Sequence, residues 1–538
     1  MRRRNNRFRA AIALVVAFAF LCAPGCGKKT PPTHDAEYDV IIIGAGMGGL
    51  SAGAHLASNG LKVLVLEQHH KVGGCTTNFT RGDYTFEVAL HELSGGGVLR
   101  LMELCGVRDK VEIYDLPDFY RSVYPGDPGV DITMPTDWEG WDNTLKEQWP
   151  EEAEGIDKFH ELCTTVFADI MGVSQLFRYS GFEGFLKKMS VPIKHKSLLT
   201  WSKKTLGDLM DECFTDEYLK AVAYQLWVYY GAPVPDQISL LTLAATEVFL
   251  TDGVKHVKGT SQALSNAYAE RIEELGGTVL TGTLVTEIII EDGIAKGVVT
   301  EYGDVYTGRY VICNTDPFQM IYTLIGEENL PAKYVEEIAG MKVANSLFVT
   351  YLGLNVDLKA LGYDDTETFY NYTTDTEVLY DNMMSANFTE GMVSITVYSN
   401  YGDPIYAPPG KSVVALLEYS DYDSWPKDPD EYQQMKDEKA WEMIELAANV
   451  IPELADPKNI DVMEVMTPVT IAEFTKNHHG IPYGFYTDLE YWEKIPNSTP
   501  IENVYIAGNW TKAWHGVGPS QVNGWMAARL IMDVEGIE

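Results

Sequence analysis

Apolar positions follow two different periods near the N-terminal end of the chain. Residues 40–43 form a short β-branched run, which indicates a strand buried on both faces. Residues 47–58 have the composition of a helix, and residues 63–66 form a second apolar strand that ends on Glu67. The pattern predicts one strand–helix–strand unit within residues 39–74.

The turn between the first strand and the helix has the sequence G-x-G-x-x-G. Gly44 allows a tight turn, Gly46 lets the backbone approach a pyrophosphate, and Gly49 lets the helix pack on the strand. Glu67 can accept hydrogen bonds from the ribose hydroxyls of an adenosine and disfavours a 2′-phosphate, which argues against NADP. The alternative is a glycine turn without a ligand. The candidate contacts of a dinucleotide are Gly44, Ala45, Gly46, Met47, Gly48, Gly49, Glu67 and Gln68.

Farther along the chain, the periodicity changes between regions. Residues 106–250 mix helical periodicity with many aromatic residues and contain no nucleotide motif. Strand-like alternation returns at residues 346–354 and 392–399. Between these regions we expect a helix at residues 263–275 and strands at 278–280 and 285–290.

Length and charge limit the function classes. A chain of 538 residues is too long for one compact core, which predicts two connected domains. The formal net charge of −36 excludes nucleic-acid binding through general electrostatics and repels anionic lipid unless a local basic patch intervenes. The seven cysteines include no C-x-x-C, so neither a metal site nor a disulfide framework is indicated.

The N-terminal segment predicts export. A basic start precedes an apolar run of signal-peptide length, and residues 1–25 are therefore expected to be a signal peptide. Cys26 follows small residues as in a lipoprotein, and ordinary cleavage and an uncleaved anchor are the alternatives. Residues 26–37 form a polar tether. We expect a protein of the bacterial cell envelope, lipid-anchored through Cys26 or exported to the periplasmic side, and the pair Arg3-Arg4 suggests the twin-arginine route.

A lysine-rich stretch at residues 184–207 interrupts the acidic background. It carries six lysines and no acid, with apolar residues and Trp201 between them. This composition is typical of an interfacial membrane contact. The alternative is a solvated face that covers the core.

Several motifs together resemble the flavin amine oxidase and phytoene desaturase superfamily, and in particular its retinol saturase and carotenoid isomerase branch. They are Gly73-Gly74, Arg81 with the segment FEVALH that ends at His91, and the C-terminal motifs at residues 504–511, 516–518 and 523–528. The resemblance implies FAD as the cofactor. It implies that these residues lie at the cofactor: Gly73, Gly74, Arg81, Val285, Gly508, Asn509 and Gly518.

The same resemblance implies an α/β fold, with a Rossmann-like FAD-binding domain of the GR2 type and an interleaved α+β substrate domain. Residues 38–105, 251–330 and 471–538 would form the FAD-binding domain. Residues 106–250 would be a helical, membrane-facing substrate region, and residues 331–470 the sheet of the substrate domain.

We therefore expect an FAD-dependent oxidoreductase that desaturates, saturates or isomerises carbon–carbon bonds of a long apolar isoprenoid, carotenoid or retinoid-like substrate taken from a membrane. Its expected acceptor is membrane quinone. His515 and His91 are the candidate catalytic residues, because an imidazole can exchange a proton near neutral pH.

Two alternatives remain open. The first is a flavin amine oxidase in which Trp510 and Trp514 form part of a cage for an amine. The second is a non-catalytic protein that binds prenyl groups or lipids, as the Rab escort proteins do on a similar fold. The intact glycine motifs and Glu67 argue against the second alternative.

Overall fold

The computed structural model describes residues 31–176, 190–489, 495–512 and 515–537. The predicted signal peptide and Cys26 lie outside these ranges. The described end of the tether lies against the first sheet, where the Glu37 backbone N–H donates to Thr307 Oγ1 at 2.9 Å. Among the described helices, none combines the length and apolar character needed to cross a membrane.

The first sheet contains the predicted strand–helix–strand unit. Its parallel strands β1 and β2 are almost wholly buried, and helices cover one face of the sheet. Beyond β1, an antiparallel layer of three strands continues the sheet. In the described part of the chain the strand order is β10 (Thr278–Leu280), β2 (Val63–Leu66), β1 (Tyr38–Ile43), β13 (Val305–Cys313), β12 (Ile294–Thr300) and β11 (Val285–Glu291), with β19 (Val504–Ile506) beside β13. The predicted strands 63–66 and 278–280 are found with the expected bounds.

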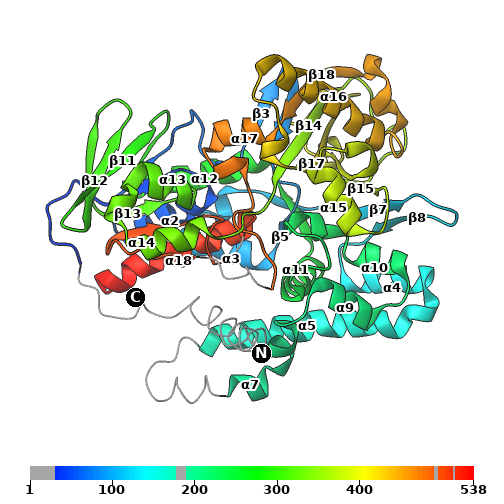
Figure 1. The fold of residues 1–538 in the computed structure, drawn as a ribbon, viewed down its shortest axis with the longest axis horizontal. Coiled ribbons are helices and arrows are strands. Elements are labelled where there is room, and N and C mark those ends of the chain that lie inside the picture. The colour runs from blue at the N-terminus through cyan, green and yellow to red at the C-terminus, as the bar shows by residue number, and fades with distance from the viewer. Residues whose placement is uncertain (1–30, 177–189, 490–494, 513–514, 538) are drawn as a thin grey trace.

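Helix α2 (Met47–Ser58) occupies the centre of this domain. It packs between α12 (Thr260–Glu274) and the C-terminal helix α18 (Val517–Glu535), which Figure 1 draws in red, and α3 (Gly96–Cys105) lies beside it. Gly524 of α18 meets Gly48 of α2 so closely that an added Cβ would lie 2.0 Å from the Gly48 carbonyl oxygen. Burial by two other helices stabilises α2 despite its glycines.

The second sheet forms the upper right part of Figure 1. Its described strands follow the order β18 (Ile460–Met466), β14 (Ser346–Leu354), β17 (Ser412–Ser420), β16 (Met392–Val397), β15 (Glu367–Asn371), β7 (Tyr120–Tyr124) and β8 (Val130–Met134). Helix α16 (Pro429–Ala447) packs on this sheet, α15 (Thr376–Met384) contacts β17, and α17 (Pro468–Thr475) follows β18.

Strands β7 and β8 correct the prediction for residues 106–250, which we expected to be helical. They pair with each other antiparallel, and β7 extends the second sheet by pairing parallel with β15. Apart from these strands and β6 (Ile113–Asp115), the region is mainly helical, and its helices lie below the second sheet in Figure 1. Its described helices of four or more residues are α4 (Trp138–Gln148), α5 (Ala153–Leu176), α7 (Val191–Lys194), α8 (Lys196–Trp201), α9 (Leu206–Cys213), α10 (Glu217–Ala223), the 3-10 helix η3 (Gln225–Tyr229) and α11 (Ser239–Asp252).

In the described half of the lysine-rich stretch, two large apolar side chains point into the protein. Leu198 and Trp201 are buried in the core. Lys204 lies 4.4 Å over the Trp201 ring and forms an ion pair with Glu212, while Lys203 is exposed. Residues 184–189 lie outside the described ranges, and contact of this stretch with a membrane stays a prediction.

Short elements connect the two sheets. They are the hairpin β3 (Asn78–Arg81) and β4 (Tyr84–Glu87), and the small sheet β5 (Leu93–Ser94), β9 (Val254–Val257) and β6 (Ile113–Asp115). The first domain also contains α13 (Pro317–Gln319), the π-helix η4 (Met320–Ile325), the 3-10 helix η5 (Glu327–Asn329) and α14 (Ala332–Ala339).

Candidate functional site

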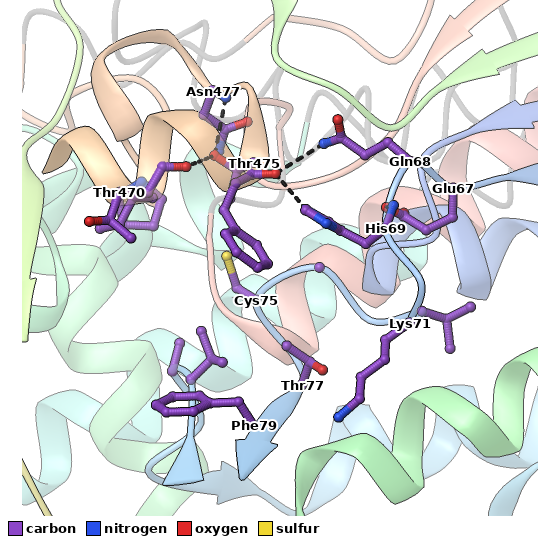
Figure 2. Close-up of a pocket in the computed structure, with 18 of the residues that line it drawn as sticks. Glu67, Gln68, His69, Lys71, Cys75, Thr77, Phe79, Thr470, Thr475 and Asn477 are labelled. Atoms are coloured by element: carbon purple, nitrogen blue, oxygen red, sulfur yellow. Dashed lines mark hydrogen bonds between the residues drawn. The ribbon is translucent and has the colours of Figure 1, made fainter. Parts of the chain in front are cut away.

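A cavity of about 600 Å³ lies between the two sheets. One end is formed by the glycine turn after β1 and the loop after β2, and the other by β3, β14, β18 and α17. Figure 2 shows Gln68 and His69 reaching across it toward the end of α17, where both side chains donate to the Phe474 carbonyl oxygen at 3.0 and 2.6 Å. The predicted contact residues that line it are Gly44, Glu67, Gln68, Gly74, Arg81 and Val285.

The glycine turn is shaped by Asn314, which follows β13. Gly44 has a φ of +96°, which favours glycine, and its carbonyl oxygen accepts from Asn314 Nδ2 at 3.3 Å. A Cβ at Gly46 would lie 2.8 Å from Asn314 Nδ2, and one at Gly48 only 2.6 Å from Asn314 Oδ1. Sequence reasoning assigned Gly46 to the pyrophosphate and missed this role of Asn314.

Glu67 is buried at the end of β2, and backbone N–H groups hold both of its carboxylate oxygens. Ala45 donates to Oε2 at 2.7 Å and His69 donates to Oε1 at 2.9 Å. The side chain therefore lines the cavity and also ties the glycine turn to the loop after β2. Each oxygen keeps a further lone pair that can accept from a ribose hydroxyl.

The N-terminus of α2 opens on the same side as the glycine turn. Its N-cap residue, Gly46, makes no side-chain cap, so the first N–H groups of the helix remain available to an anion. Gly73 and Gly74 have positive φ values, and a Cβ at Gly74 would lie 3.2 Å from the Cα of Gly46. These two glycines therefore let the second loop approach the first.

The opposite end of the cavity is apolar. Phe79 of β3 packs edge-on against Tyr351 of β14, with ring centroids 5.1 Å apart, and the Tyr351 hydroxyl donates to the Val88 carbonyl oxygen. Arg81 stands at this end with half of its side chain exposed, and it pairs with Glu464 at 2.6 Å. The apolar lining comprises Phe79, Val88, Ala89, Leu347, Tyr351, Val465, Met466 and Ile471.

These features fit FAD. An uncapped helix start and a tight glycine turn suit the diphosphate, Glu67 suits the adenosine ribose, and the cavity continues into an apolar region that suits a flavin ring. Val285, at the start of β11, lines the end that contains Glu67, as the adenine contact requires.

The predicted C-terminal contacts lie behind the cavity wall. The Gly508 backbone nitrogen packs against Gly48, and the Asn509 side chain donates to the carbonyl oxygen of Pro482, which lines the cavity. Gly518 lies in the first turn of α18 against Val98. Their contact with a flavin stays a prediction.

Neither candidate histidine lines the cavity, but Tyr229 joins them. His91 Nδ1 lies 3.1 Å from the Tyr229 hydroxyl and 2.8 Å from Glu367 Oε1. His515 Nε2 lies 2.7 Å from the Tyr229 carbonyl oxygen. The importance of Tyr229 and Glu367 had no signal in the sequence, because each lies more than 100 positions from the histidines it contacts.

Trp510 is not available as part of an amine cage. It is buried in the core of the first domain, where it packs edge-on against Phe485 with centroids 5.0 Å apart. Trp514 lies outside the described ranges. Among the described residues, no group of histidine, cysteine, aspartate or glutamate side chains could hold a metal ion.

The fold and the site define a flavoprotein built from a dinucleotide-binding domain and an interleaved substrate domain. A family model for flavin containing amine oxidoreductases matches residues 47–532, and the chain belongs to this family. It is an FAD-dependent oxidoreductase.

Among curated proteins, the chain is similar to a 4,4'-diapophytoene desaturase from a Methylomonas species, with 26% identity over 91% of this chain and 94% of the relative. It is 24% identical to an all-trans-retinol 13,14-reductase of Danio rerio, over 88% of this chain and 82% of the relative. It is also 24% identical to a prolycopene isomerase of an Oncidium hybrid, over 96% of this chain and 87% of the relative.

Solved structures show the same fold. The cyclohexylamine oxidase of Brevibacterium oxydans superposes with a TM-score of 0.58 at 16% identity, covering 93% of this chain and 99% of the oxidase. At this identity the likeness concerns the fold alone.

Proposed function

We propose that this enzyme desaturates, saturates or isomerises carbon–carbon bonds of a long apolar isoprenoid, carotenoid or retinoid-like molecule. The observation that carries the proposal is that one continuous cavity joins the glycine turn and Glu67 to an apolar end between β3, β14 and β18. A cofactor at the glycine turn would extend toward that apolar wall. The curated relatives act, by their names, on molecules of this kind.

The residues of the chain have distinct roles in this proposal. Glu67 and the α2 N-terminus would hold the adenosine and diphosphate of FAD, which supplies hydride transfer when bound. Phe79 and Tyr351 exclude water from the apolar end and position a polyene by packing. His91 or His515 would hold the proton that accompanies hydride transfer.

Mass spectrometry of the small molecules released from the detergent-purified protein tests the cofactor and a bound lipid together. The FAD-loaded enzyme is then incubated without oxygen with 4,4'-diapophytoene, prolycopene or all-trans-retinol, once with oxidised FAD and once with FAD reduced by dithionite. A product two hydrogens lighter identifies a desaturase, one two hydrogens heavier a saturase, and an isomer of equal mass an isomerase. FAD without turnover of any polyene, together with peroxide release from amines in air, would support the amine oxidase alternative instead.

The N-terminal sequence supports a location at the cell envelope, with Cys26 as the lipid-modified residue. At that location, a membrane would be the source of substrate and quinone the electron acceptor. Labelling of the full chain with radioactive palmitate in a bacterial host tests this part separately. We expect label in the native chain and none in Cys26→Ser. Equal labelling of both, or of neither, would contradict lipidation at Cys26.

A further inference from the structure

A buried polar cluster lies where β15, β16 and η3 meet the segment before β5. Four donors surround a single oxygen, Oε1 of Glu367. His91 Nδ1 lies at 2.8 Å, Ser394 Oγ at 2.6 Å and Thr396 Oγ1 at 3.3 Å, and the Tyr229 hydroxyl donates to the same oxygen. The Glu367 side chain has no exposed surface, while 7% of the His91 side chain remains accessible.

Glu367 is the carboxylate of this cluster that stays charged. Burial alone would raise its pKa, but the charge of His91 and the hydrogen bonds from His91, Ser394 and Tyr229 hold the pKa below its usual range. A fully buried carboxylate without a cation would be very costly, and among the groups that contact it only His91 can become one.

The other titratable groups around the pair are driven toward their uncharged forms. Burial first, and then the charges of Glu367 and Asp118, raise the pKa of Glu92 well above its usual range. Burial also raises the pKa of Asp118 and lowers that of His256, which stands near His91, to about 4. The neighbouring phenols Tyr229 and Tyr398 have raised pKa values, again through burial first, and stay protonated.

The hydrogen bonds fix where the ring protons lie. A carboxylate and a backbone carbonyl can only accept, so His91 carries a proton on Nδ1 and His515 carries one on Nε2. The second ring nitrogen of His91, Nε2, is therefore the one that exchanges a proton. Tyr229 connects the two rings through its hydroxyl and its carbonyl oxygen.

This cluster adjoins the cavity on two sides. Ala89 lines the cavity two positions before His91. The His515 ring packs on Tyr483 with centroids 4.7 Å apart, and the residue before Tyr483, Pro482, lines the cavity. Burial, and then the charges of Glu367 and Cys75, raise the pKa of the Tyr483 hydroxyl, and Cys75 itself lines the cavity.

We propose that Glu367 and Tyr229 are positioning residues that hold His91 and His515 as one unit beside the cavity, with the exchangeable proton on His91 Nε2. This rests on the proposed carbon–carbon chemistry. Saturation of a double bond consumes one proton besides the hydride from reduced flavin, and desaturation releases one. The Nε2–H bond breaks in the first case and forms in the second, while Glu367 remains a carboxylate throughout and balances the imidazolium.

Two variants separate charge from packing. Glu367→Gln keeps an oxygen acceptor but removes the charge, and Tyr229→Phe removes only the hydroxyl while keeping the carbonyl contact with His515. With all-trans-retinol, 4,4'-diapophytoene or prolycopene as probe, we expect kcat of Glu367→Gln to fall about 10- to 100-fold. We expect the KM of Glu367→Gln to stay within about twofold of the native value and the pH profile of its kcat to shift. In Tyr229→Phe we expect a smaller fall in kcat.

A readout that needs no turnover is the low-field proton resonance of the His91 Nδ1–H group. It should be present in the native protein, shifted upfield in Glu367→Gln, where a neutral amide oxygen replaces the carboxylate, and absent in His91→Asn. Glu418→Gln is the matched control, because Glu418 is an equally buried glutamate of the same sheet, on β17. It should leave kcat, the pH profile and the resonance unchanged.

The outcomes distinguish this inference from the proposed function. Native-like kcat and pH profiles in both Glu367→Gln and Tyr229→Phe would overturn the inference while leaving the function standing. Native-like persistence of the resonance in Glu367→Gln would overturn it as well. If the native enzyme turns over none of the three polyenes, the proposed function fails, and an upfield shift of the resonance in Glu367→Gln would still establish the hydrogen-bonded pair.

Discussion

Replacing Glu67 by Gln tests the central claim about the cofactor site. In the native protein both carboxylate oxygens accept a backbone N–H, from Ala45 and from His69. An amide offers only one oxygen, so its NH₂ group must face one of these two donors. The substitution therefore breaks one of the two ties and places two donors against each other in a buried position.

The expected magnitude follows from that loss. A hydrogen bond to a charged group contributes about 1.5–3 kcal/mol, and each 1.4 kcal/mol is tenfold in affinity. We therefore expect the Kd for FAD to rise about 10- to 100-fold in Glu67→Gln. Glu464→Gln is the control, because that glutamate also lines the cavity but pairs with the half-exposed Arg81. It should change the Kd less than about fivefold.

Titration of the apoprotein with FAD and with FMN, followed by flavin fluorescence, separates two roles of Glu67. FMN lacks the adenosine, so an acid that contacts only the ribose would leave FMN binding unchanged. Because Glu67 also holds Ala45 in the glycine turn, we expect FMN binding to weaken too, by a smaller factor than FAD binding. Unchanged affinity for both flavins would refute the reasoning.

Three further predictions address packing, retention of the cofactor and pH. Gly524→Ala places a methyl group against the backbone of α2 and should destabilise the protein by about 1–3 kcal/mol in urea unfolding. Gly97→Ala, in open space on α3, should be neutral or stabilising in the same measurement. His69→Ala removes the hydrogen bond and the ring stacking that tie the loop after β2 to Phe474, and FAD should leave about tenfold faster in a dilution experiment. Burial raises the pKa of Glu87 to about 8, so the folded protein keeps a proton that the unfolded chain releases above pH 4.5. The free energy of unfolding should therefore fall as the pH rises from about 5 to 8. Glu87→Gln should remove part of that slope, and an unchanged slope would contradict the assignment.

Local patterns were sufficient to predict the strand–helix–strand unit of the first domain. Residues 47–58 and 63–66 fold as predicted, because the apolar run, the glycines and the acid all favour the same strand–helix–strand unit. Strand β7 was missed although its burial alternates from Tyr120 to Tyr124. Its aromatic residues fit a helical core equally well, and its pairing with β15 spans more than 200 positions.

The candidate site was predictable only where function lies within one short segment. Glu67 and the glycines belong to one turn, so their spacing reveals them. The contacts of His91 with Glu367 and Tyr229 arise when strands from distant parts of the chain come together, and no spacing records them. Asn314 is an intermediate case, since its strand was predicted but its contact with the glycine turn was not.

Three buried glutamates show how the donor set decides the role of one residue type. Glu67 accepts backbone N–H groups at the end of a strand, which suits a fixed wall of a nucleotide site. Burial raises the pKa of Glu87 although Ser261, at the start of α12, donates to its carboxylate, and the nearby His256 is itself held neutral by burial. Glu367 is equally buried, but it contacts a histidine that can carry the compensating charge, and its pKa is lowered instead. Because a directly hydrogen-bonded histidine is the difference between Glu367 and Glu87, the exchangeable proton that we propose is assigned to the His91–Glu367 pair.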